Sequence, residues 1–302
     1  MKGLRKALLI GMTLGVTVLG AVGCMNQSSD SSNDVLKVGA ISFAGTLEPT
    51  ENYFSWAVVR YGVGETLIKF DDHMNATPWL ATSWKQSDDK MTWTFIINDK
   101  VKFSNGNPLT AEAVKASLER TFGKSKRAKS FFNYTEIAAN GQELTIKTDK
   151  PYYNLPNLLG DPLFLIMDVT AEANGRDIAK EGPIGTGPYV ATELVTDDHV
   201  NLVKNENYWN GDVNVDEITV RTISDGDTLA MALQAGEINA AYGMAYASYP
   251  LFENDDFTFT STATSRAFYA WMNFESPVTS DPAVRKAIAM GIDKDSFVSV
   301  LL

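Results

Sequence analysis

The sequence predicts a mixed α/β (α+β) protein, and three of its features lead to this class. Stretches with apolar residues at every second position, typical of strands, alternate with stretches whose apolar residues lie three or four positions apart, typical of helices. The 302 residues exceed the usual size of one domain, so two domains or one large discontinuous domain are expected. With 44% hydrophobic and 21% charged residues, the chain can bury a core and is neither fibrous nor disordered.

The expected elements begin at residue 35 and continue to the end of the chain. Alternation of apolar and polar residues predicts strands at residues 35–42, 92–97, 101–103, 189–194, 200–204, 217–223 and 266–274. Helical spacing, beginning with Trp56, Val59, Val63 and Leu67, predicts helices at residues 56–67, 111–122, 228–234 and 282–290.

Local signals define several boundaries of these elements. Thr110 and Asp227 are expected to cap the helices that follow them, and Pro282 suits the first turn of the last helix. Asn140-Gly141 predicts a hairpin between two short strands. The glycines and prolines of residues 183–188 predict a tight reversal where two chain segments cross, which is an architectural role and not a ligand site.

Charge and residue counts exclude several classes of function. Three of the 26 Lys and Arg residues and none of the 37 Asp and Glu residues lie in residues 1–23, so the remaining chain has a net charge of −14. Such a surface disfavours nucleic-acid binding, which depends on cations that neutralise phosphates. One cysteine and two histidines, His73 and His199, exclude a disulfide within the chain and a closed zinc site. We expect no cofactor and no enzymatic activity.

Residues 1–23 are typical of a signal peptide. Lys2, Arg5 and Lys6 precede an apolar run at residues 7–22 that is too short for a membrane-spanning helix. The run leads through small residues into Cys24, which resembles the lipobox of bacterial lipoproteins and predicts lipidation of Cys24. Ordinary signal cleavage beside an incidental cysteine is the alternative. Residues 24–35, rich in Ser, Asn and Asp, would then tether the body to the outer face of the bacterial cytoplasmic membrane, at the cell surface or in the periplasm.

Four stretches in this order resemble the family 5 solute-binding proteins of bacterial ABC importers, which capture oligopeptides, dipeptides and nickel chelates. They are Trp79-Leu80-Ala81-Thr82-Ser83-Trp84 with residues 92–95 and 101–114, Pro183-Ile184-Gly185-Thr186-Gly187-Pro188-Tyr189 with residues 205–209, residues 235–239, and residues 282–288 with 292–294.

The resemblance implies a bilobed, periplasmic-binding-protein-like fold with an inserted subdomain. Lobe I would comprise residues 36–70 and 190–272, and the inserted subdomain residues 71–189. Residues 273–302 would contain a hinge near Asn273 and the start of lobe II. Because family members are considerably longer and this sequence ends in an apolar stretch, the chain is expected to be a fragment or an interrupted product that lacks most of lobe II.

The same resemblance implies ligand-binding residues and partners. Arg127 falls about where nickel-binding relatives place an arginine that faces a ligand carboxylate, although a solvated cation is an equal alternative. Tyr53 and Trp56 could line the cleft, and core packing is the alternative for Trp56. The expected ligand is a small peptide or a nickel chelate, delivered to the permease subunits of the importer.

Two other classes of function stay open on the sequence alone. A surface adhesin or a sensor could use the same lobes. A secreted hydrolase would need a positioned acid–base pair or an activated nucleophile, and the paired carboxylates Asp71-Asp72, Asp88-Asp89 and Asp255-Asp256 lie in polar stretches that are typical of solvated turns.

Overall fold

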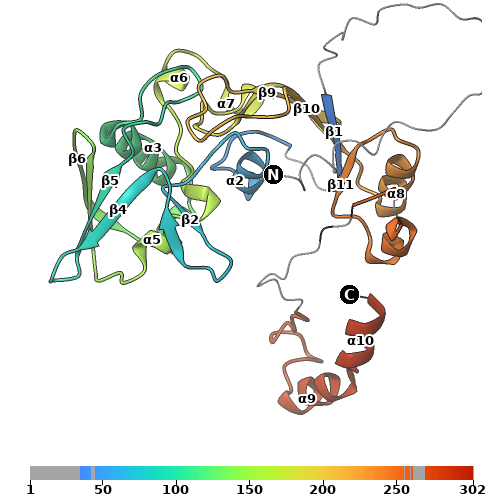
Figure 1. The fold of residues 1–302 in the computed structure, drawn as a ribbon. Coiled ribbons are helices and arrows are strands. Elements are labelled where there is room, and N and C mark those ends of the chain that lie inside the picture. Colours follow the sequence, from blue (N-terminus) through green and yellow to red (C-terminus); the bar gives the residue numbers. More distant parts are fainter. Residues whose placement is uncertain (1–34, 42–44, 255, 259, 261–268, 302) are drawn as a thin grey trace, which may run out of the picture.

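The computed structural model describes residues 35–41, 45–254, 256–258, 260 and 269–301. It confirms a mixed α/β fold built on several sheets, drawn in Figure 1. The predicted signal peptide, Cys24 and the tether up to residue 34 lie outside the described residues.

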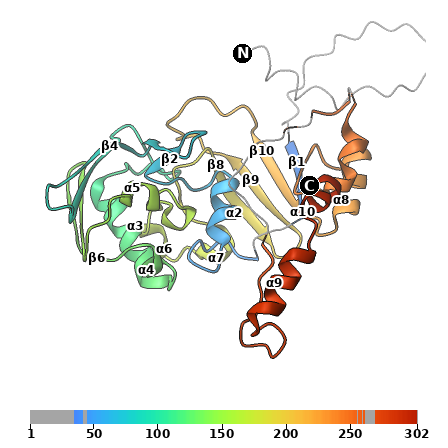
Figure 2. The same ribbon diagram turned by 90° about the horizontal axis from the view of Figure 1, so that it is seen from below.

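A five-stranded sheet forms the first layer of the structure. Its strand order is β11-β1-β10-β9-β8, and β1 runs parallel to both of its neighbours, β10 and β11. The strands are β1 (Val35–Ala40), β8 (Tyr189–Val195), β9 (His199–Lys204), β10 (Glu217–Thr222) and β11 (Ala240–Tyr242). Helix α2 (Phe54–Arg60) lies against this sheet in Figure 2, and its Val58 shares a buried cluster with Val200 and Leu202. At the other edge, α8 (Gly226–Gln234) packs beside β1 and β11.

A second body holds a four-stranded antiparallel sheet in the order β4-β5-β7-β6. Its strands are β4 (Ala81–Gln86), β5 (Thr92–Ile97), β6 (Tyr134–Asn140) and β7 (Glu143–Thr148), next to the small hairpin β2 (Ile68–Phe70) and β3 (Ala76–Pro78). Helix α3 (Ala111–Lys124) buries Leu118 and Phe122 in one cluster with Phe95 of β5 and Ile146 of β7. The short helices are α4 (Ala128–Phe131), α5 (Leu155–Leu158), η1 (Pro162–Phe164), α6 (Thr170–Ala173), α7 (Ile178–Glu181) and η2 (Tyr246–Phe252).

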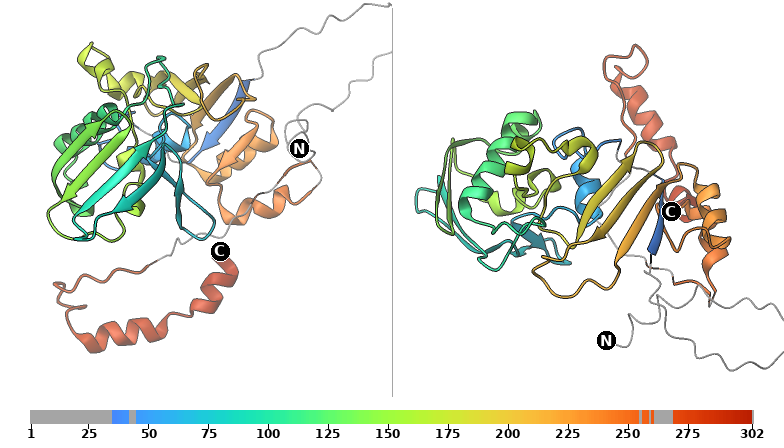
Figure 3. Two further views of the ribbon diagram at one scale, coloured as in Figure 1. Left: turned by 60° about the vertical axis from the view of Figure 1, so that its left-hand side comes forward. Right: turned by 90° about the horizontal axis from the view of Figure 1, so that it is seen from above.

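Two further helices, α9 (Pro282–Gly291) and α10 (Lys294–Leu301), stand apart from both sheets in Figures 1 and 3. No residue of α9 is buried, and the side chain of Trp271, which precedes it, is 91% exposed. The predicted hinge residue Asn273 accepts a hydrogen bond from the backbone of Glu275 and begins a turn. Its role as a hinge stays a prediction.

Several local predictions are confirmed. Strand β5 has the expected bounds, and the Thr110 side chain accepts a hydrogen bond from the Ala113 amide at 3.2 Å as the N-cap of α3. Gly141 takes the left-handed conformation (φ +62°) in the β6–β7 hairpin. Pro282 occupies the first turn of α9, where Asp281 is the cap.

Other boundaries were predicted wrongly. The expected helix at 56–67 ends at Arg60, because Gly62 takes φ +72° and the chain leaves the helical path before Val63. Asp225 and not Asp227 caps α8, since its carboxylate accepts from the Thr228 amide at 2.7 Å.

Two expected strands are also absent from the described residues. Residues 101–103 contribute an isolated bridge between Lys102 and Pro108 instead of a strand. Residues 269–274 are not a strand, and residues 266–268 of that expected strand lie outside the described residues.

The glycine- and proline-rich stretch at 183–188 does lie at a chain crossing. The Tyr189 amide donates to the Gly62 carbonyl at 3.0 Å. A Cβ on Gly185 would lie 2.0 Å from the Val63 carbonyl oxygen, and one on Gly187 would lie 2.1 Å from the Gly62 carbonyl oxygen. Only glycine lets the two backbones approach this closely.

Two buried clusters underlie the two bodies. The cluster under the five-stranded sheet includes Leu165, Met167 and Ile178, while Leu67 and Ile68 belong to the cluster of the four-stranded sheet. The division of the chain into lobe I, an inserted subdomain and the start of lobe II stays a prediction.

Candidate functional site

Helix α2 occupies the place where α/β folds commonly bind ligands. The parallel strands β1, β10 and β11 end at Ala40, Thr222 and Tyr242, so their carboxyl ends meet at one edge of the sheet. Ligands of open α/β sheets bind outside the carboxyl ends of such strands. Tyr242, 44% exposed, stands at this edge and α2 lies close to it.

One side of α2 is buried and the other is exposed. Ser55 and Val58 are fully buried. Tyr53, Trp56 and Arg60, at helical spacing on the opposite side, are exposed, with 66% and 46% of the two aromatic side chains accessible. We call these three side chains the α2 face. Because 46% of the Trp56 side chain is exposed, core packing is wrong for this residue, and its place in the ligand cleft stays a prediction.

Arg127 joins the α2 face from a distant part of the sequence. Its guanidinium carbon lies 3.9 Å from the centroid of the Tyr53 ring, and its Nη1 donates to the carbonyl oxygen of Asn52. Tyr53, Trp56 and Arg127, which were singled out from sequence, therefore lie together. Their role in binding stays a prediction.

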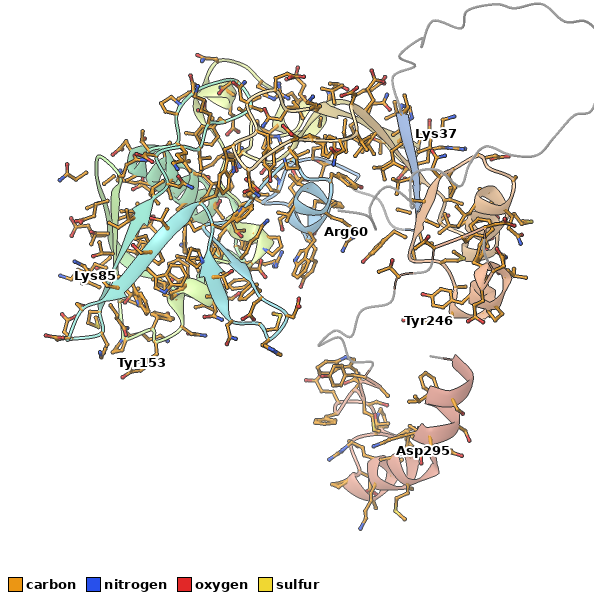
Figure 4. All side chains as sticks on the ribbon, viewed as in Figure 1. Lys37, Arg60, Lys85, Tyr153, Tyr246 and Asp295 are labelled. Carbon is orange, nitrogen blue, oxygen red and sulfur yellow. The ribbon has the colours of Figure 1, made fainter. Side chains whose placement is uncertain are left out.

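Arg60 and Tyr242 were missed by sequence reasoning. The guanidinium of Arg60 lies over the Tyr242 ring, 4.5 Å from its centroid. The two residues are far apart in sequence and meet only because Tyr242 pairs with Ala40 in the register of β11 on β1. No local motif signals that contact. Figure 4 shows Arg60 and Tyr246, which is 45% exposed, on the side of the molecule that faces α9 and α10.

The two guanidiniums of this region have no carboxylate partner among the described residues. Neither Arg60 nor Arg127 forms an ion pair there, although the chain holds 37 acidic residues. Two cations without an internal carboxylate partner, beside exposed aromatic rings, suit an anionic ligand with an apolar part.

Arg120 shows the opposite arrangement. Its side chain, 7% exposed, contacts Glu48 at 2.6 Å and also donates to Glu172, which Lys124 contacts at 2.5 Å. Burial alone would raise the pKa of Glu48, but hydrogen bonds from Arg120 and Thr50 outweigh it and lower that pKa. The hydrogen bond from Arg120 lowers the pKa of Glu172 to about 2. These four residues, which we call the Arg120 cluster, join three chain segments, and both of its cations contact internal carboxylates.

Glu65 is a buried carboxylate at the junction between the two bodies. Its Oε1 accepts from the indole of Trp79 at 3.0 Å, and its Oε2 accepts from Thr186 at 2.8 Å and from the indole of Trp209 at 3.1 Å. Burial raises the pKa of Glu65, against the effect of these three donors. We call this set the Glu65 cluster, and its position between segments makes it a structural link.

Metal-binding and membrane-spanning features are absent from the part of the chain that the structure describes. No group of three or more His, Cys, Asp or Glu side chains there is placed to hold a metal ion. None of the helices there is both long and apolar enough to span a bilayer.

Comparison with protein families decides the class of this structure. Residues 75–302 match the model described as bacterial extracellular solute-binding proteins, family 5 Middle. The chain belongs to this family. Membership confirms the periplasmic-binding-protein-like fold, the expectation of a binding protein instead of an enzyme, and export from the cytoplasm.

Individual relatives of this family 5 chain bind different solutes. The nickel-binding protein NikA of Staphylococcus aureus is 33% identical over 73% of this chain and 42% of its own length. The glutathione-binding protein GsiB of Shigella flexneri is 29% identical over 95% of this chain and 57% of its own length. A crystal structure of NikA from Staphylococcus aureus in complex with Ni(L-His)2 superposes with a TM-score of 0.68 at 30% identity, covering 73% of this chain and 46% of that one. The chain spans about half the length of the curated relatives it matches.

Proposed function

We propose that the protein is the solute receptor of an ABC importer. It captures a small peptide or a nickel chelate outside the cytoplasmic membrane and delivers it to the permease subunits. The observation that carries this proposal is the family match over residues 75–302. The nickel- and glutathione-binding relatives support the two ligand classes.

The α2 face is the proposed ligand contact. Tyr53 and Trp56 would stack against the ligand, and Arg127 would bind a ligand carboxylate. A guanidinium held over an aromatic ring is restrained in position while its edge still offers N–H donors. Motion of the lobes about a hinge near Asn273 would enclose the ligand.

The binding proposal is tested with the complete protein, expressed from its own gene. Isothermal titration with Ni(II) and L-histidine at one to two, and separately with glutathione, should give saturable binding of one of the two. Arg127→Gln should weaken that binding by about tenfold or more, the usual effect of losing a hydrogen bond to a charged group. Absence of binding in both titrations would contradict the proposal.

Transport is tested in cells. Deletion of the gene should abolish high-affinity uptake of radiolabelled nickel or glutathione, and the wild-type gene should restore it. Unchanged uptake together with altered adhesion or signalling would favour the adhesin or sensor class instead.

We also propose that Cys24 carries the lipid anchor of the exported protein, with residues 24–34, up to the first residue of β1, as its tether. Cys24→Ser should release the protein from the membrane fraction into the soluble fraction and abolish incorporation of labelled palmitate. Equal membrane association of the variant and the wild type would contradict lipidation.

A further inference from the structure

Two stacked guanidiniums stand at opposite ends of α2. Arg127 lies over Tyr53, which precedes the first residue of the helix, and Arg60 is its last residue and lies over Tyr242. The seven residue steps from Tyr53 to Arg60 correspond to a rise of roughly 10 Å along the helix backbone. Trp56 projects from the same side of the helix between these two ends.

Stacking restrains each guanidinium without consuming its donors. The five N–H groups of a guanidinium lie in its plane, so a contact of its central carbon with a ring leaves them able to donate. Arg127 uses one of them on the Asn52 carbonyl, and the others have no carboxylate partner among the described residues. Two restrained cations without an internal anion are complementary to a ligand with two anionic groups.

We propose that the α2 face selects a small solute with two separate carboxylates. Arg127 binds one carboxylate, Arg60 binds the other, and Trp56 covers the part between them. This inference rests on the proposed function and adds to it the charge pattern of the ligand and a second anchoring residue, Arg60. An ordinary dipeptide, with one ammonium and one carboxylate, matches the two cations less well.

Two kinds of solute with two carboxylates, a peptide and a metal chelate, are available as probes. Glutathione is a tripeptide with a carboxylate at each end, and Ni(II) with two L-histidines is a chelate with two carboxylates. Glutathione monoethyl ester lacks one carboxylate, and Ni(II) with two histamines keeps the imidazole and amine donors but lacks both. Binding of glutathione would show that the solute is a peptide, and binding of the Ni(II)–histidine complex would show that it is a chelate.

The experiment is isothermal titration of the complete wild-type protein and three variants with these four probes. Arg60→Gln and Arg127→Gln should each weaken binding of the two-carboxylate probe by about tenfold or more. The monoester should bind wild type weaker by a similar factor, and the histamine chelate, which lacks both carboxylates, by a larger one. Lys85→Gln removes an exposed cation from β4, on the other body (Figure 4), and should change nothing.

For the tripeptide, the charge pattern predicts a further result. In one of the two arginine variants the monoester should bind as tightly as glutathione, because the blocked carboxylate has already lost its partner.

Each other outcome is decisive. If wild type binds a probe but Arg60→Gln binds it equally well, or if removal of carboxylates has no effect, the two-carboxylate inference is overturned and the proposed function stands. If wild type binds neither two-carboxylate probe, the proposed function and this inference both fail.

Discussion

Arg120 and Arg127 lie seven residues apart in the sequence, but their guanidinium groups have opposite surroundings. Arg120 is buried between Glu48 and Glu172, whereas Arg127 rests on the Tyr53 ring and meets no carboxylate among the described residues. A charge removed from water must be paired, because an isolated buried charge is costly. An exposed one can take its partner from solution. The ion pairs of Arg120 therefore join distant segments of the fold, whereas Arg127 is available to a ligand.

The largest expected effect comes from breaking the Arg120 cluster. Arg120→Ala leaves the buried carboxylate of Glu48 without its cation, and we expect the free energy of unfolding to fall by about 3–5 kcal/mol. Lys124→Ala removes a half-exposed member of the same cluster and should cost about 1 kcal/mol or less. Urea denaturation followed by circular dichroism measures both. Equal effects of the two changes would show that Arg120 is not the centre of the cluster.

The next largest effect on stability is expected at the chain crossing that ends α2. Gly185→Ala would place a methyl group 2.0 Å from the Val63 carbonyl oxygen, so we expect a loss of about 1–3 kcal/mol in the free energy of unfolding. Gly123→Ala is the matched control, because its Cβ would meet no atom within 4 Å and α3 should gain about 0.5–1 kcal/mol. A similar change in both variants would refute the close crossing.

At the Glu65 cluster, the pH dependence of stability tests whether burial or hydrogen bonding dominates the pKa of Glu65. Glu65→Gln replaces one carboxylate oxygen by an NH2 group, which cannot accept a hydrogen bond from the indole or hydroxyl donors. The free energy of unfolding should therefore fall by about 1–2 kcal/mol at neutral pH. Because burial raises the pKa of Glu65 above its usual value of 4.5, its protonation favours the folded state. This contribution is fully present below pH 4.5 and is lost as pH rises through the folded pKa.

The stability of wild type relative to Glu65→Gln should therefore increase on acidification. Paired urea denaturation series across that window measure the slope. A relative stability that falls with acidification would show that hydrogen bonding outweighs burial at Glu65.

The smallest effect on stability is expected at the α2 face. Arg127→Gln should lower the free energy of unfolding by only about 1 kcal/mol, because it removes a hydrogen bond to the Asn52 carbonyl and a contact with the Tyr53 ring but no internal ion pair. Thermal or urea denaturation checks this value beside the Arg120 variants. A loss comparable to that of Arg120→Ala would make Arg127 a structural residue and remove it from the proposed ligand contacts.

Local chemistry was predictable from sequence, and contacts between distant segments were not. Strand β5 and the Thr110 cap depend on residues within one element, and both were predicted correctly. The early end of α2 depends on the crossing with residues 185–187, far along the chain, so helical spacing through Leu67 was misleading. The family motifs predicted the class of protein because they extend, in the same order, over most of the chain.

The candidate site likewise contains residues that the sequence indicated and contacts that only the fold reveals. Tyr53, Trp56 and Arg127 were named from the resemblance, and the structure places them together. The contact of Arg60 with Tyr242 requires the register of β11 on β1 and could not be deduced from spacing. Glu65 likewise becomes a link only when Trp79 and Trp209 are brought to it by the fold.

The most direct test of the central claim is hydroxyl-radical footprinting of the complete protein with and without a bound solute, using whichever of Ni(II)-bis-L-histidine and glutathione binds. Tyr53 and Trp56 should become protected when the solute is added. Tyr153, 71% exposed on the other body (Figure 4), serves as the internal control and should not change. Saturable binding that leaves the oxidation of Tyr53 and Trp56 unchanged would contradict the assignment of the α2 face as the ligand surface.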